Sequence, residues 1–218
     1  MARWGMVIDL QRCIGCWACN VACKQEHFLP PGMLWNRVLV GESGIYPNVR
    51  KEMVPVLCNH CEDAACVRVC PTGASTRRDD GLVLVDYEKC MGCGYCLVAC
   101  PYQHRSFYRS NQDKGYFPDQ GYTEFELLGR ELHPFTKGTV LKCTFCQERI
   151  DRGIEKGLEP GVDRDATPAC VNICVPKARV FGDLDGPDSP IARLIQEKSG
   201  KAFHPEFGTE PSVYYITG

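Results

Sequence analysis

Short apolar runs, rather than long amphipathic periods, mark the regular structure that this chain is expected to form. Residues 6–8 (Met-Val-Ile) are one such run, and residues 82–85 (Leu-Val-Leu-Val) are a second that follows the turn sequence Asp-Asp-Gly at 79–81. An Asp-Gly turn that leads into an apolar run is typical of a β-hairpin, so both runs are predicted to be strands. Asp-Ser-Pro at 188–190 is a helix start, and we expect that helix to stop at Gly200.

Long apolar segments are missing from this sequence. No uninterrupted stretch reaches the roughly 18–20 residues that span a bilayer. The residues before Cys13 hold neither an apolar signal core nor a twin-arginine pair, so we expect no signal or transmembrane segment of the chain's own. The protein is then expected to be peripheral to the membrane through its partners. Both the cytoplasmic face and the periplasm, reached by export with a partner, fit this expectation.

Cysteine usage decides between the broad classes of protein. Sixteen of the 218 residues are cysteine, which indicates either a disulfide scaffold or a metal protein. Disulfide scaffolds belong to oxidising compartments and follow a secretory signal, so the metal interpretation is favoured. The formal net charge is −2 and no basic stripe is present, which argues against a nucleic-acid partner. Sixteen thiolates around four 2+ cubane cores would add about eight negative charges.

The cysteines form four groups of four, and none is left over. The groups are Cys13-x2-Cys16-x2-Cys19-x3-Cys23, Cys58-x2-Cys61-x4-Cys66-x3-Cys70, Cys90-x2-Cys93-x2-Cys96-x3-Cys100, and Cys143-x2-Cys146 with Cys170-x3-Cys174. Three cysteines at i, i+3 and i+6 can converge on three iron corners of one cubane. The fourth is expected at the start of a helix, where it ligates the other cluster of a two-cluster ferredoxin. Tetrahedral zinc needs pairs instead of triplets with a displaced fourth, so a structural zinc protein is disfavoured.

The groups also show that the chain is a tandem duplication of a two-motif unit. Groups one and three are near copies, and Asp9 and Asp86 each lie four residues before their first cysteine. Groups two and four correspond through Ala-Cys-Val at residues 65–67 and 169–171. The predicted hairpin lies between groups two and three, as in a two-cluster ferredoxin, which favours one shared module for these two groups.

Groups one and four are then left to pair with each other. This interleaved scheme predicts four [4Fe–4S] ligand sets: Cys13, Cys16, Cys19 and Cys174 for cluster one; Cys23, Cys143, Cys146 and Cys170 for cluster two; Cys58, Cys61, Cys66 and Cys100 for cluster three; Cys70, Cys90, Cys93 and Cys96 for cluster four. Spacing alone also permits pairing in sequence order, one with two and three with four.

The segments 58–74 (CNHCEDAACVRVCPTGA) and 90–102 (CMGCGYCLVACPY) resemble the four-cluster iron–sulfur subunits of the molybdenum or tungsten bis-pterin oxidoreductases, the dimethyl-sulfoxide and polysulfide reductase type. The likeness extends over residues 5–185 and also favours the interleaved scheme. It implies four [4Fe–4S] clusters that relay electrons between a bis-pterin catalytic subunit and a quinone-linked membrane subunit or other redox partner. One departure from the pattern is that Val175 and Pro176 follow Cys174, where a proline would come directly.

The expected fold is α+β, with two interleaved bacterial-ferredoxin-like modules, long loops, and a C-terminal helix and tail. The predicted ranges are 1–54 with 138–186 for groups one and four, 55–108 for groups two and three, 109–137 for an aromatic-rich insert, and 187–218 for the C-terminal helix and docking tail. Residues 101–142 contain eight Phe or Tyr residues, which either dock on a partner subunit or pack on their own domain.

No catalytic residue is expected in this chain. A self-contained iron–sulfur enzyme needs a cluster iron without a protein ligand, and sixteen cysteines for four clusters leave no such iron. His60, inside a Cys-x-x-Cys loop, either donates a hydrogen bond to cluster sulfur or only packs. The other histidines show no ligand spacing.

Overall fold

The computed structural model describes residues 2–117 and 119–217. Met1, Pro118 and Gly218, which the predicted ranges include, lie outside the described residues. The helices are α1 Ala18–Glu26, α2 Ala65–Arg68, α3 Tyr95–Ala99, α4 Glu124–Leu132, α5 Gln147–Glu155, α6 Ala169–Asn172 and α7 Pro190–Glu197. The strands are β1 Trp4–Asp9, β2 Asn36–Ile45, β3 Asn48–Leu57, β4 Ser75–Arg77, β5 Val83–Val85, β6 Ser106–Phe107, β7 Val140–Leu141, β8 Arg179–Asp183, β9 Lys201–Ala202 and β10 Val213–Ile216. The predicted α+β fold is confirmed.

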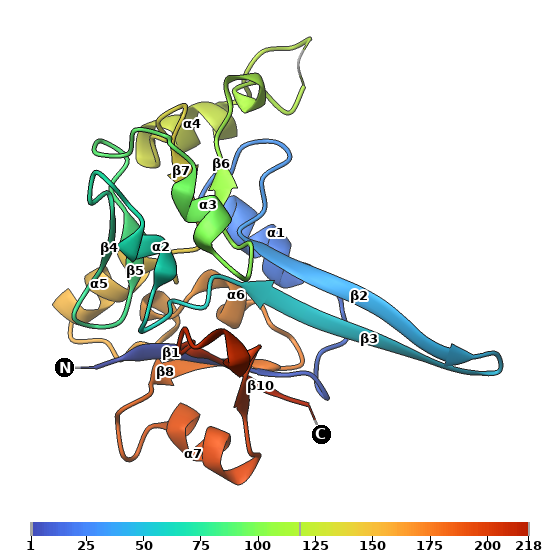
Figure 1. Ribbon diagram of the computed structural model, residues 1–218. Coiled ribbons are helices and arrows are strands. Elements are labelled where there is room, and N and C mark those ends of the chain that lie inside the picture. Colours follow the sequence, from blue (N-terminus) through green and yellow to red (C-terminus); the bar gives the residue numbers. More distant parts are fainter. Residues whose placement is uncertain (1, 118, 218) are drawn as a thin grey trace.

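A four-stranded sheet with the order β8-β1-β10-β9 joins the two ends of the chain (Figure 1). Strand β1 contains the predicted run 6–8 and is buried along its whole length. It runs antiparallel to β8 and parallel to β10. Helix α7 covers one face of this sheet, where Ile191 packs with Val7 and Ile216. The C-terminal tail therefore packs on the segments that carry groups one and four.

Besides the four-stranded sheet, the described residues form three two-stranded sheets, β2 with β3, β4 with β5 and β6 with β7. The predicted hairpin is present, with β4 and β5 paired from Ser75 opposite Val85 to Arg77 opposite Val83. A much longer hairpin, β2 with β3, was not predicted from the sequence and extends away from the body of the protein (Figure 1). Its tip residues Ile45 and Tyr46 are 85% and 89% exposed. A lone two-stranded ribbon is marginally stable in water, so this arm gains from contact with another surface.

The main hydrophobic core surrounds the cysteines. Cys19, Cys23, Cys143 and Cys170 are buried in one cluster of side chains with Met6 and other apolar residues of the four-stranded sheet. Helices α1 and α6, which carry three of these four cysteines, pack directly against each other. The apolar core and the metal-ligating region are therefore one volume.

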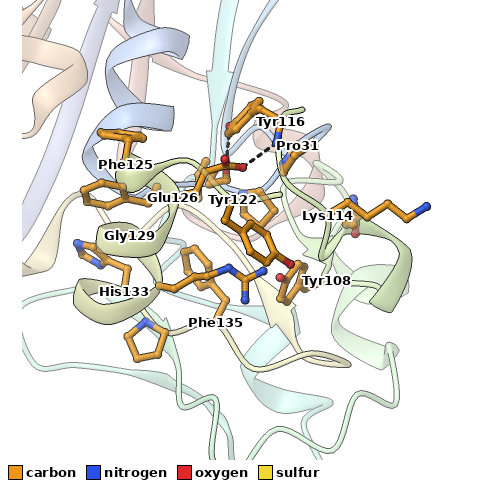
Figure 2. A pocket seen from close by; sticks show the side chains of 16 residues that line it. Pro31, Tyr108, Lys114, Tyr116, Tyr122, Phe125, Glu126, Gly129, His133 and Phe135 are labelled. Atoms are coloured by element: carbon orange, nitrogen blue, oxygen red, sulfur yellow. Dashed lines mark hydrogen bonds between the residues drawn. The ribbon is translucent and has the colours of Figure 1, made fainter. Parts of the chain in front are cut away.

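The aromatic insert contains a helix that the sequence analysis did not predict. Thr123 caps α4, because its hydroxyl accepts a hydrogen bond from the Glu126 backbone N–H, and the Glu126 carboxylate accepts one from the Thr123 N–H. The Phe125 ring packs 4.6 Å from that of Phe28. Figure 2 shows the aromatic side chains around a cavity of about 270 Å³ between α4 and the loop that follows α1. The inner side of the insert therefore packs on its own chain.

Asp113 holds the two ends of this insert together. Its side chain is 9% exposed, pairs with Arg130 and Lys137, and accepts a hydrogen bond from the Tyr108 hydroxyl. Partial burial acts to raise its pKa, but the bonds from Lys137 and Arg130 hold the pKa of Asp113 at about 2. Since this value lies below the unfolded value of about 4, the stabilisation is present at neutral pH and is lost as the pH falls from 4 through 2.

We predict that Asp113→Asn loosens the insert at neutral pH without removing cluster iron. Losing the charge of a group bonded to two cations costs about 1–3 kcal/mol of local stability. Limited proteolysis of the holo-protein should then cut within residues 109–137 faster than in the parent. The exposed Asp119 is the matched control, and Asp119→Asn should leave the cutting rate unchanged. Equal rates for both variants would contradict the role given to Asp113.

Candidate metal centres

The first Cys-x-x-Cys loop of each of the four cysteine groups has the same backbone conformation. In each loop the residue two positions after the first cysteine has a left-handed backbone, with φ values of 64° for Gly15, 44° for His60, 74° for Gly92 and 56° for Phe145. This turn aims backbone N–H groups at the preceding thiol, as the 3.4 Å contact from the Phe145 N–H to the Cys143 Sγ shows. Glycine adopts the conformation freely, whereas a side chain costs about 1–2 kcal/mol. Four separate loops therefore have the geometry typical of sulfur sites.

A second repeated feature corrects the expectation for the displaced cysteines. The third cysteine of every group is the second residue of a helix, namely Cys19 in α1, Cys66 in α2, Cys96 in α3 and Cys170 in α6. The fourth cysteine comes four residues later, which is about one helical turn. It therefore lies inside α1 (Cys23) or just past the end of a short helix, and not at a helix start. One helical turn therefore separates the third and fourth cysteines of each group.

Two of the predicted ligand sets line separate cavities. Cys13, Cys16, Cys19 and Cys174 line one cavity, together with Arg179. Cys70, Cys90, Cys93 and Cys96 line another. The backbone N–H of Ser75 donates to the Cys70 Sγ at 3.3 Å, and that of Ala178 donates to the Cys174 Sγ at 3.3 Å. Each cavity thus brings three cysteines of one group together with the fourth of a distant group.

The cysteines of the other two predicted sets lie close enough to act on one another. Burial and then the charge of Cys58 raise the pKa of Cys61 to about 12, and Cys66 and Cys100 add to the same shift. Thiols at this pKa stay protonated at neutral pH, so iron binding must displace their protons.

The remaining predicted set, Cys23, Cys143, Cys146 and Cys170, combines cysteines that are far apart in the sequence. Burial and then the charges of Cys143 and Cys170 raise the pKa of Cys23, and burial with Cys170 and Cys23 does the same for Cys146. All four of these thiols are buried. Three belong to group four, and Cys23 ends the spacing pattern of group one.

Buried hydrogen-bond donors next to the cysteines fit iron–sulfur clusters. Asn20 follows Cys19, while Asn59 and Thr144 lie inside Cys-x-x-Cys loops. The Nδ2 atoms of Asn20 and Asn59 and the Oγ1 of Thr144 are buried, and none finds a partner among the described residues. Bridging sulfide and thiolate sulfur accept hydrogen bonds, so a [4Fe–4S] cluster supplies what these donors lack. When bound, such a cluster takes up and releases one electron at a time.

Two histidines contact the cysteine region in different ways. The His60 ring stacks on Phe145 with centroids 3.9 Å apart, and its Nδ1 accepts from the Val83 N–H at 3.0 Å. Its buried Nε2 has no hydrogen-bond partner among the described residues. His27, to which the sequence analysis gave no role, places Nε2 3.3 Å from the Cys146 Sγ. Burial lowers the pKa of His27 to about 3, so its ring is neutral. The two partners are 119 positions apart, so spacing holds no signal of this contact.

Comparisons with known proteins also indicate that the chain binds iron–sulfur clusters. Residues 49–117 match the model of the 4Fe-4S dicluster domain family. The chain is 39% identical to the arsenate respiratory reductase iron–sulfur subunit of a Shewanella strain, over 98% of this chain and 96% of that protein. It is 38% identical to a subunit of the selenate reductase of Mesobacillus selenatarsenatis, over 99% of this chain and 72% of that protein. It is also 38% identical to a subunit of the sulfite dehydrogenase of Allochromatium vinosum, over 99% of this chain and 83% of that protein.

The fold and the repeated cysteine loops define a multi-cluster iron–sulfur protein for electron transfer. The chain belongs to the family of iron–sulfur subunits of molybdenum or tungsten bis-pterin oxidoreductases. It is an electron-relay subunit with [4Fe–4S] clusters, sixteen cysteines suffice for four of them, and a catalytic subunit is its partner. Within the described residues, no helix combines the length and apolar character needed to cross a bilayer.

We predict that Gly92→Ala removes one cluster and that Gly94→Ala does not. Both glycines have a left-handed backbone, with φ values of 74° and 77°. An added Cβ at Gly92 would lie 2.1 Å from the Gly138 carbonyl oxygen, whereas at Gly94 the nearest atom is 4.0 Å away. The first variant should lose about four of roughly sixteen irons per chain, measured as iron and acid-labile sulfide. Full iron content in Gly92→Ala would contradict this account of the loop.

Proposed function

We propose that the chain passes electrons through four [4Fe–4S] clusters, between a bis-pterin catalytic subunit and a second redox partner, which is either a quinone-linked membrane subunit or another redox protein. The proposed ligands are Cys13, Cys16, Cys19 and Cys174 for cluster one, Cys23, Cys143, Cys146 and Cys170 for cluster two, Cys58, Cys61, Cys66 and Cys100 for cluster three, and Cys70, Cys90, Cys93 and Cys96 for cluster four. The main support for this proposal is that two cavities, those that clusters one and four would fill, are each lined by three cysteines of one group and the fourth cysteine of another.

Contacts between the sets support a row in the order one, two, three, four. Burial is the main cause of the raised pKa of Cys23 and of Cys170, both in set two. The charge of Cys19, in set one, adds to both shifts, and this supports an arrangement with sets one and two side by side. Cys58 acts in the same way on the buried Cys143, which supports a link between sets two and three. Short separations between neighbouring clusters allow an electron to move along the row in single hops.

The two ends of the row are the proposed sites of electron entry and exit. Cys16 in set one and Cys93 in set four are exposed, whereas all four cysteines of set two are buried. Apolar side chains stand beside both exposed cysteines: Ile14 is 61% exposed and Val98 is 90% exposed. Exposed apolar surface next to a redox centre suits a docking site, because a partner that covers it also excludes water.

The division of the chain follows from these sets. We propose one module from residues 1–54 with 138–186 and a second from 55–108, joined by the insert 109–137 and completed by the helix and tail 187–218. In the insert, the inner aromatic residues pack on the chain itself, so docking is assigned to the outer side, where Phe117 is 54% and Leu132 is 58% exposed. Attachment through such partners would keep the chain peripheral to the membrane.

We predict that cysteine variants sort by proposed set and not by sequence group. Cys23→Ala and Cys146→Ala should abolish the same cluster signal in electron paramagnetic resonance, because both thiolates belong to set two. Cys19→Ala, four residues from Cys23, should abolish a different one. If Cys23→Ala instead removes the same signal as Cys61→Ala, groups one and two pair in sequence order and the interleaved scheme is wrong.

The relay is tested in the complex with the catalytic subunit. Cys96→Ala removes a buried ligand of cluster four, so turnover driven through the second redox partner should fall at least about tenfold, equivalent to 1.4 kcal/mol in the barrier. A small dye that exchanges electrons directly with the catalytic partner avoids the row, and turnover with it should be unchanged. A variant that lacks the cluster but keeps full turnover by the physiological route would exclude the relay. Zinc in place of iron in the native complex would also exclude it.

A further inference from the structure

Three cations are buried in the cysteine region without carboxylate partners. Arg105, Lys142 and Arg179 are 7%, 1% and 3% exposed. Among the described residues, no Asp or Glu side chain forms an ion pair with any of them. A buried charge without a counter-charge costs several kcal/mol, so the surroundings must supply negative charge from another source.

Arg105 lies between sets three and four. Its Nη2 donates to the Cys66 Sγ at 2.9 Å, and its Nη1 donates to the Ser75 Oγ at 2.8 Å. The Ser75 backbone N–H in turn donates to the Cys70 Sγ. Although burial opposes it, the charges of Cys66 and Cys96 raise the pKa of Arg105. The guanidinium therefore stays charged and faces one cysteine of each set.

Arg179 has the same position between sets one and two. Its Nη1 lies 3.7 Å from the Cys170 Sγ, and its side chain also lines the cavity of set one. Its Nη2 donates to the Asn36 Oδ1 at 2.9 Å, which fixes the guanidinium in place. Strand β8 carries Arg179, so the four-stranded sheet positions this cation.

Lys142 is the third buried cation, and it lies next to set two. It directly precedes Cys143, and its Nζ donates to the Cys143 carbonyl oxygen. Burial is the main cause of the raised pKa of Cys143 and of Cys66, and the charge of Lys142 opposes the shift in both. One ammonium group therefore acts on a cysteine of set two and on a cysteine of set three.

We propose that Arg105, Lys142 and Arg179 each lie between two neighbouring clusters of the row, and that each raises the reduction potentials of the two clusters that flank it. The proposal rests on the ligand sets proposed above. A cluster with four thiolates carries a charge of about −2 when oxidised and −3 when reduced. A cation stabilises the reduced form more than the oxidised form, because the attraction scales with charge. Placed between two clusters, it also offsets the repulsion between electrons on both.

The test is a redox titration of the holo-subunit, followed by electron paramagnetic resonance, with one cation neutralised at a time. Lys142→Met should lower the potentials of clusters two and three and leave one and four unchanged. Arg105→Met should lower the potentials of clusters three and four, and Arg179→Met should lower those of clusters one and two. Lys156, an exposed cation just after α5, is the control, and Lys156→Met should shift no cluster.

Variants that keep the charge separate electrostatics from structure. Arg105→Lys and Arg179→Lys alter the hydrogen bonds but retain the cation, so their cluster potentials should stay near those of the parent. Equal shifts in Arg105→Lys and Arg105→Met would overturn the proposal, and so would a shift confined to one flanking cluster or spread equally over all four.

The outcomes for assembly and for the relay are also distinct. If one Met variant fails to assemble, the other two carry the test, and loss of iron from all three would assign these cations a structural role instead. Unchanged potentials in an iron-replete Lys142→Met protein would refute the tuning role while leaving the relay intact. An error in the proposed ligand sets would instead be detected with the cysteine variants described above, because those variants do not alter these cations.

Discussion

Thiolate ligation of iron is the constraint on which the rest of this structure depends. Four of the sixteen cysteines, Cys19, Cys23, Cys143 and Cys170, are buried among the apolar side chains of the main hydrophobic core. Burial raises the pKa of Cys23, Cys143 and Cys170, so neither charge nor hydrogen bonding of the protein alone makes their ionised form favourable. Clusters bring negative charge and sulfur acceptors to the place where the chain has buried cations and unpartnered donors.

Duplication of a two-motif unit explains how one chain builds this centre twice. The left-handed residue recurs at the same position in the first Cys-x-x-Cys loop of every group, and the third cysteine recurs as the second residue of a helix. The residue at this left-handed position differs between the groups. It is glycine in groups one and three, whereas it is His60 in group two and Phe145 in group four, and these two rings stack on each other. In groups two and four this position has thus become a contact between two cysteine loops.

Local signals in the sequence were sufficient for part of this architecture. The run at 6–8, the hairpin ending at 82–85 and the helix that begins at Pro190 all appear, because each depends on neighbours within a few residues. The helix ends at Glu197, before Gly200. Pairing of β1 with β8 and β10 and the burial of Arg179 depend on segments far apart in the chain. In sequence, Arg179 looks like any surface arginine, and only the fold reveals that it is buried.

The position of β1 in its sheet has a consequence for synthesis of the protein. This strand is made before all the other described strands, yet both of its neighbours, β8 and β10, lie beyond residue 178. During translation the strand must wait for most of the chain, while β4 and β5 can pair within a dozen residues. A chain that ends before β10 leaves β1 with an open, apolar edge, which is a template for aggregation. Premature termination near the C-terminus therefore threatens solubility at the opposite end.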